Sequence, residues 1–199
     1  MELTSHNSIA VLAFPPDAGY PRLTKEVLAE LGGLLEEVRF SGVFQGVVIA
    51  ANSHSFATGA SLQEVARIEG VSARDFAQAG QSLFNDIANF PFPIVAGIRG
   101  YCLGGGLDLA LACHARVATY DASFGHPGVS LGLITGWGGT QRLARLIGRA
   151  AATQILLTRE RVPASQALTL GLVDELASSA DLVEVAACRA LSAGCHIGG

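Results

Sequence analysis

Short apolar runs and amphipathic stretches alternate along the first 120 residues of the chain. Runs of mainly aliphatic residues predict buried strands at 8–14, 47–50, 94–98 and 115–119. Apolar residues at helical spacing, or glycines that precede an apolar run, predict helices at 24–40, 72–89 and 107–113. Thr24 and Ser72 are the expected N-caps of the first two helices. Strands that alternate with helices predict an α/β fold with mostly parallel strands and with helices outside.

The pattern becomes helical beyond Trp137, and no segment there has the composition of a linker between domains. The chain is therefore expected to form one domain, 1–199. The glycine turn at 136–139 is expected to set the start and direction of a helix. Tyr101 and Trp137 are expected in the core, with the lining of a pocket as the alternative.

Composition and charge exclude several classes of protein. Half of the residues are apolar and 15% are charged, which excludes a disordered chain. The net charge is −4 and no Lys/Arg run is present, so neither nucleic acid nor an anionic membrane is an expected partner. The N-terminus lacks a signal-peptide pattern and no apolar run approaches transmembrane length, so a cytoplasmic location is expected. The four cysteines and five histidines show no disulfide or metal-ligand spacing, so no metal is expected.

Two glycine-bearing turns lead into helices, at 56–62 and 103–109. The first amides of a helix have no partner within it, and the helix dipole adds partial positive charge there. If the two turns converge, one amide from each could hold a single oxygen atom, as in an oxyanion hole. A glycine turn before a helix is more often a simple break between two elements. Either turn by itself therefore leaves open both a structural role and a role in an oxyanion hole.

Four segments, taken together and in order, resemble the crotonase superfamily, that is, the enoyl-CoA hydratase/isomerase family. The similar segments are 56–64, 98–110, 122–143 and 167–175. The resemblance covers nearly the whole chain and implies a crotonase-like spiral of ββα repeats. It also implies an acyl-CoA thioester as substrate and a role in fatty acid metabolism. Coenzyme A would be part of this substrate, so no separate cofactor is expected. The resemblance further implies a homo-oligomer, either a trimer or a hexamer.

The resemblance assigns roles to particular positions. The backbone amides of Ala60 and Gly105 would form the oxyanion hole, and Asp108 stands at the family's first acid position, where it would manage a proton or a water molecule. The residues implied to contact the substrate and its coenzyme A are Ala57, Thr58, Gly59, Ala60, Gly104 and Gly105. Asp108 would also complement the dipole of its helix as a first-turn carboxylate, and the two roles are compatible.

The sequence departs from the family pattern at the second acid position, which is Gly128. Hydration conventionally uses two carboxylates, one to position water and one to deliver a proton. His126 could carry the proton instead, although a histidine in a Gly-His-Pro turn is more often a structural hydrogen-bonding group. Ser61 also replaces a frequent Asp, which is a smaller change.

A second departure lies at the C-terminus. Family members continue well beyond Glu175 with helices that cover the acyl pocket and help to build a trimer, so 175–199 is expected to be the start of an incomplete C-terminal helical region. Two functions remain open. One is an acyl-CoA-binding enzyme of the enoyl-CoA hydratase/isomerase type that stabilises a thioester enolate. The alternative is a catalytically weak or inactive acyl-CoA-binding relative that acts as a subunit.

Overall fold

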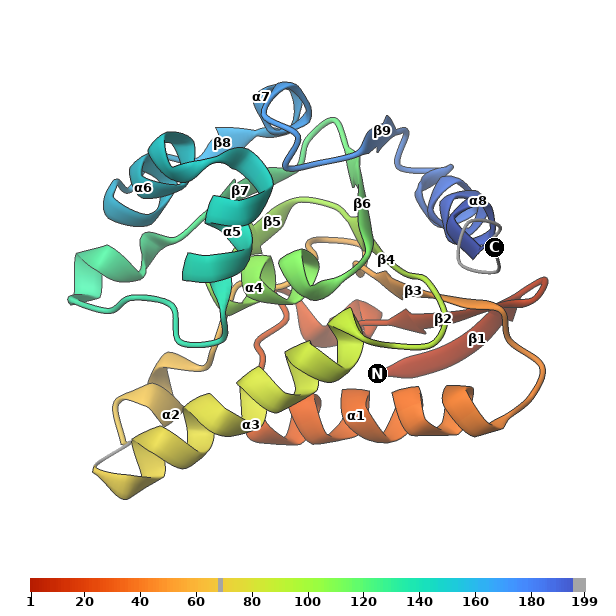
Figure 1. Ribbon diagram of the computed structural model, residues 1–199, viewed down its shortest axis with the longest axis horizontal. Coiled ribbons are helices and arrows are strands. Elements are labelled where there is room, and N and C mark those ends of the chain that lie inside the picture. The colour runs from red at the N-terminus through yellow and green to blue at the C-terminus, as the bar shows by residue number, and fades with distance from the viewer. Residues whose placement is uncertain (68–69, 195–199) are drawn as a thin grey trace.

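Two sheets form the frame of the protein in the computed structural model, which describes residues 1–67 and 70–194 (Figure 1). The main sheet has the order β1 (Glu2–His6), β2 (Ile9–Ala13), β3 (Gly46–Ala50), β4 (Ile94–Ile98), β6 (Ala115–Thr119) and β9 (Glu175–Ala177). All of its neighbouring pairs are parallel except β1 with β2. The small sheet has the order β5 (Tyr101–Leu103), β7 (Ser123–Gly125) and β8 (Val162–Pro163). The predicted α/β fold with mostly parallel strands is confirmed.

Helices cover both faces of the main sheet. The α-helices are α1 (Lys25–Phe40), α2 (Leu62–Val65), α3 (Val71–Ala88), α4 (Gly105–Ala112), α5 (Gly139–Ile147), α6 (Arg149–Leu157), α7 (Ala164–Thr169) and α8 (Leu182–Gly194). Short 3-10 turns lie at η1 (Pro16–Ala18) and η2 (Pro127–Leu131). The larger core joins one face of the sheet to α1, α3 and α4, whereas α8 packs on the other face, as Figure 1 shows. Strands β3, β4 and β6 are buried along their whole length, which explains why β3 and β4 are continuous apolar runs, whereas β6 also contains Arg116 and Thr119.

Most of the predicted elements are present, and one predicted cap is wrong. The Thr24 hydroxyl accepts a hydrogen bond from the Val27 amide at 3.3 Å, so the first N-cap is confirmed. The prediction of Ser72 as a cap is wrong, because α3 begins at Val71 and its N-cap is Gly70, at a φ of 50°. A backbone with positive φ favours glycine, and this preference outweighs the hydroxyl two residues later.

Five strands were not predicted: β1, β5, β7, β8 and β9. Strand β1 lies at the sheet edge and is half exposed, while the other four have two or three residues each and carry no usable periodicity. The region from 175 onward therefore opens with a strand, and α8 follows it. Residues 195–199 of the expected C-terminal helical region lie outside the described residues. None of the helices in the described part of the chain is long and apolar enough to cross a membrane.

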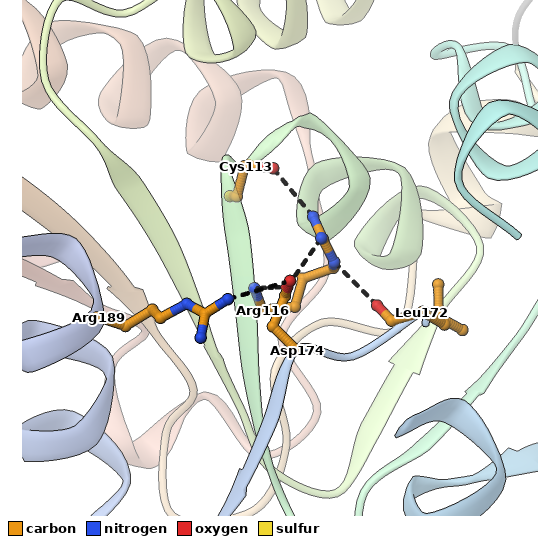
Figure 2. Close-up of polar contacts among 5 residues, drawn as sticks. All are labelled: Cys113, Arg116, Leu172, Asp174 and Arg189. Carbon is orange, nitrogen blue, oxygen red and sulfur yellow. Dashed lines mark hydrogen bonds and ion pairs between the residues drawn. The ribbon is translucent and has the colours of Figure 1, made fainter. Parts of the chain in front are cut away.

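A buried arginine on β6, Arg116, forms hydrogen bonds with the segment that precedes β9 (Figure 2). Arg116 on β6 donates hydrogen bonds from its guanidinium to the carbonyls of Cys113 and Leu172, at 3.0 and 2.8 Å. Its backbone amide and its Nη2 both donate to Oδ2 of Asp174, at 2.8 and 2.9 Å. Arg189 on α8 approaches Oδ1 of the same carboxylate at 3.5 Å. The connection before β9 is thus held by several polar contacts at one point.

Candidate active site

The two glycine-bearing turns converge, as expected if they act together. The Leu103 amide donates to the carbonyl of Ala57 at 2.9 Å, which joins the two segments through their backbones. A Cβ placed on Gly59 would lie 3.3 Å from the Gly105 nitrogen, and one placed on Gly105 would lie 3.5 Å from the Ala60 nitrogen. The amides of Ala60 and Gly105 are therefore close neighbours. Gly59 has a φ of 96°, a backbone conformation that glycine adopts without strain.

Both amides are available to a ligand. Within the described residues, neither the Ala60 nor the Gly105 amide donates a hydrogen bond to a backbone carbonyl. Gly105 is the first residue of α4, where a helix leaves its amides without internal partners. Both residues line the same cavity. The arrangement therefore has the elements of an oxyanion hole, two adjacent donors and the positive end of a helix dipole.

The cavity has a volume of about 640 Å³, within the range of roughly 300–1,000 Å³ that is usual for small-molecule sites. Its wall is largely apolar and comes from α2, α3 and the segment 127–137. The predicted residues that line it are Thr58, Gly59, Ala60, Gly104, Gly105 and Asp108. Ala57 does not belong to the lining. It is fully buried behind the turn, where its backbone joins the two segments.

Asp108 lies in the first turn of α4 with a fully buried side chain. The Thr135 hydroxyl donates a hydrogen bond to its Oδ2, and the Trp137 amide donates to the carboxyl group as well. Burial raises the pKa of Asp108 to about 7, an effect that these two hydrogen bonds partly offset. A carboxyl group with a pKa near neutrality suits proton transfer in both directions.

The second carboxyl oxygen of Asp108, Oδ1, faces Gly139 at the start of α5. A Cβ on Gly139 would overlap this oxygen, so glycine is needed here to leave space for the carboxyl group. The residue pattern of the 136–139 turn predicts only the start of a helix. Thr135 and the Trp137 amide could not be predicted as partners of Asp108, because nothing in this pattern indicates which distant side chain the turn contacts.

His126 lies next to Asp108 and lines the cavity as well. Its side chain is 5% exposed, and its Nε2 lies 3.6 Å from Oδ1 of Asp108. In the described part of the chain, neither of these two atoms has a hydrogen-bond partner. Burial lowers the pKa of His126 to about 4, so its imidazole is neutral near pH 7. Gly128 also lines the cavity and brings no polar side chain to it.

Comparison with known proteins places the chain in one family. Residues 4–193 match the family model for enoyl-CoA hydratase/isomerase. DspI from Pseudomonas aeruginosa is 30% identical, with 96% of this chain and 73% of that one aligned at a TM-score of 0.88. An enoyl-CoA hydratase from Bacillus anthracis is 29% identical, over 96% of this chain and 75% of that one, at a TM-score of 0.89. An enoyl-CoA hydratase from Thermoplasma volcanium is 27% identical, over 95% of this chain and 76% of that one, at a TM-score of 0.89. The match over nearly the whole chain and the shared crotonase fold show that the chain belongs to the enoyl-CoA hydratase/isomerase family.

Proposed function

We propose that this chain is an acyl-CoA-binding enzyme of the enoyl-CoA hydratase/isomerase type, which stabilises a thioester enolate. The observation that carries this proposal is the convergence of the Ala60 and Gly105 amides beside Asp108 in one cavity. Donors that point to the place where negative charge develops stabilise the transition state more than the ground state. Coenzyme A is part of the substrate in this proposal, and no separate cofactor takes part.

The proposed chemistry begins with the thioester carbonyl, whose oxygen accepts hydrogen bonds from the Ala60 and Gly105 amides. The ionised carboxylate of Asp108 then removes a proton from the carbon next to the carbonyl, and the electron pair of that C–H bond moves onto the carbonyl oxygen. The two amides hold the resulting enolate. Return of the proton to carbon 4 of an enoyl chain completes an isomerisation, for which one carboxyl group is sufficient. Because Gly128 supplies no second carboxyl group, this site favours a proton shift over hydration.

The rest of the substrate can lie along the cavity. Arg22 and Thr58 lie at its wall, where they could contact the polar pantetheine and phosphate groups of coenzyme A. Leu131 and Ile134 are 57% and 66% exposed and also line the cavity, so apolar surface remains uncovered beside it. This uncovered surface supports the proposal of a homo-oligomer, either a trimer or a hexamer, in which a neighbouring copy covers these residues.

A second function is favoured by one specific observation, the lack of a carboxylate at Gly128. A protein that keeps the two amides and the cavity but transfers protons poorly would be an acyl-CoA-binding subunit of low activity. Both functions predict that the protein binds acyl-CoA esters, but only the enzyme converts enoyl-CoA esters at an appreciable rate. A kinetic experiment therefore distinguishes the two functions.

The experiment is a spectrophotometric assay with crotonyl-CoA, longer enoyl-CoA esters and 3-enoyl-CoA esters. It compares wild type with Asp108→Asn, and uses Asp86→Asn, on an exposed position of α3, as the matched control. Turnover that falls by on the order of 10² or more in Asp108→Asn alone supports the enzyme, since that is the lower range of a general acid–base contribution. Saturable binding without turnover in wild type supports the low-activity subunit. Failure to bind any acyl-CoA ester would contradict both functions.

A further inference from the structure

Two buried polar atoms face each other in the candidate site without a hydrogen-bond partner among the described residues. They are Oδ1 of Asp108 and Nε2 of His126, 3.6 Å apart. Buried polar groups are nearly always paired, because an unpaired one costs free energy comparable with a lost hydrogen bond. Both side chains line the cavity, so the two atoms lie where the acyl group is proposed to react.

The contacts of Asp108 define which of its oxygens is free to react. Thr135 donates to Oδ2, whereas Oδ1 packs against Gly139 and has no hydrogen-bond partner among the described residues. His126 is fixed by the turn between β7 and η2, where Pro127 follows it directly. The imidazole therefore approaches the one carboxyl oxygen that does not accept the Thr135 hydrogen bond.

We infer that His126 is the proton-exchange partner of Asp108, accepting through Nε2 the proton that Asp108 removes from the substrate and returning a proton to the same carboxyl oxygen. This inference rests on the proposed function. A separation of 3.6 Å is longer than a hydrogen bond, and a small shift on substrate binding brings the two atoms within range, as catalytic hydrogen bonds often tighten only in the complex. His126 is then a positioning residue that acts through Asp108, and it offsets the lack of a carboxyl group at Gly128.

The proton balance of the exchange is simple. The C–H bond of the substrate breaks, an O–H bond forms on Asp108 and the electron pair moves to the thioester oxygen. The O–H bond then breaks and an N–H bond forms on His126, which becomes an imidazolium ion beside a carboxylate. Water that enters the cavity takes a proton from the imidazolium ion and later gives one back, so nothing is oxidised or reduced. The low pKa of His126, about 4, means that it holds this proton only briefly.

The test follows the fate of a label during isomerisation. The substrate is 3-butenoyl-CoA that carries two deuterium atoms on carbon 2, and the product is analysed by mass spectrometry. Direct return by Asp108 moves one deuterium atom to carbon 4, whereas exchange through His126 loses it to water. Loss of label per turnover is independent of how much of the enzyme is folded, so a merely structural role of His126 would not change it.

We expect wild type and the control His54→Gln, at an exposed loop position, to lose the label in most turnovers. His126→Gln should lose it on the order of tenfold less often per turnover, because a positioned proton-transfer group contributes at least that much. Equal loss in wild type and His126→Gln overturns this inference and leaves the proposed function standing. A wild type that turns over no enoyl-CoA overturns both.

A second measurement applies if His126→Gln does not fold. The ¹⁵N resonances of the His126 imidazole are compared between wild type and Asp108→Asn, both bound to a saturated acyl-CoA ester. Direct exchange between the two groups predicts a shift of the Nε2 resonance in the variant and no shift for His54. Unchanged His126 resonances overturn the inference.

Discussion

The indole ring of Trp137 occupies the space in which a side chain on Gly80 would lie. A Cβ on Gly80 would overlap the indole nitrogen, which donates a hydrogen bond to the carbonyl of Phe76 at 3.3 Å. The ring packs against Phe76 and Phe84, with centroid separations of 5.1 and 5.7 Å. Since the Trp137 amide also donates to Asp108, this contact connects the middle of α3 to the candidate active site.

Gly80→Ala should destabilise the protein, because the new methyl group forces the indole of Trp137 to move. We expect the free energy of unfolding to fall by about 1–3 kcal/mol, the usual range for an overpacked site, measured by urea denaturation. Gly33→Ala is the control, also within a helix but with no atom within 4 Å of the added Cβ. It should raise stability by about 0.4–1 kcal/mol, because alanine restricts the unfolded chain. The same effect from both changes would contradict the close packing at Gly80.

The four inner strands of the main sheet, β2, β3, β4 and β6, could be predicted from the sequence because they are almost entirely buried. Strands that are buried on both faces are mainly apolar, as 47–50 and 94–98 are. The contacts of the site could not be predicted in the same way. The hydrogen bond from Thr135 to Asp108 joins residues 27 positions apart, and depends on the conformation of a glycine-bearing segment that no periodicity describes. The resemblance to a family located Ala60, Gly105 and Asp108 but not their partners.

Arg116 should contribute much more to stability than Arg189, although both contact Asp174. Arg116 is 5% exposed and its guanidinium bonds to two carbonyls and a carboxylate, whereas the Arg189 side chain is 40% exposed. Arg116→Gln leaves buried acceptors unpaired, so we expect a loss of about 3–5 kcal/mol in the free energy of unfolding. Arg189→Gln removes a partly exposed ion pair and should cost at most about 1 kcal/mol. Urea denaturation of both variants measures the difference, and similar losses would contradict the assigned role of Arg116.

The pH dependence of stability should separate Asp108 from His126. Burial raises the pKa of Asp108 from 3.8 to about 7, so the folded protein binds this proton more tightly and loses stability as the pH rises between these values. Burial lowers the pKa of His126 from 6.5 to about 4, so the unfolded protein binds this proton more tightly than the folded protein does. His126 therefore makes the folded protein less stable as the pH falls from 6.5 to about 4. In wild type the two contributions oppose each other. Each unit of pKa shift corresponds to about 1.4 kcal/mol.

Single substitutions should reveal these opposing contributions. The stability of Asp108→Asn relative to wild type should rise by a few kcal/mol from pH 4 to pH 7, at about 1.4 kcal/mol per unit of pKa shift. The stability of His126→Gln relative to wild type should fall from pH 4 to pH 6.5. Denaturation curves at several pH values measure both, and relative stabilities that change in the same direction would contradict the opposite effects of burial on the two groups.

Gly128→Glu should raise hydration activity, because it places a carboxyl group at the position to which the family resemblance assigns a second acid. The backbone permits the change. A Cβ on Gly128 would lie 3.2 Å from the Leu133 carbonyl and 3.5 Å from its Cβ, so the neighbouring backbone needs to shift by only a few tenths of an ångström. The new side chain would extend from the wall of the cavity that also holds Asp108 and the two amides.

Two carboxyl groups on one cavity can divide the work of hydration, one orienting water and the other delivering the proton. We expect the rate of crotonyl-CoA hydration to rise by on the order of 10² in Gly128→Glu, followed by the loss of enoyl absorbance. Gly128→Gln has the same size and no acid, so it should stay at the wild-type rate. If Glu and Gln behave alike, the acid at this position does not limit hydration. The cause would then lie in how the cavity holds water near Asp108, and solvent-isotope effects on the residual rate would show whether water attack has become the slow step.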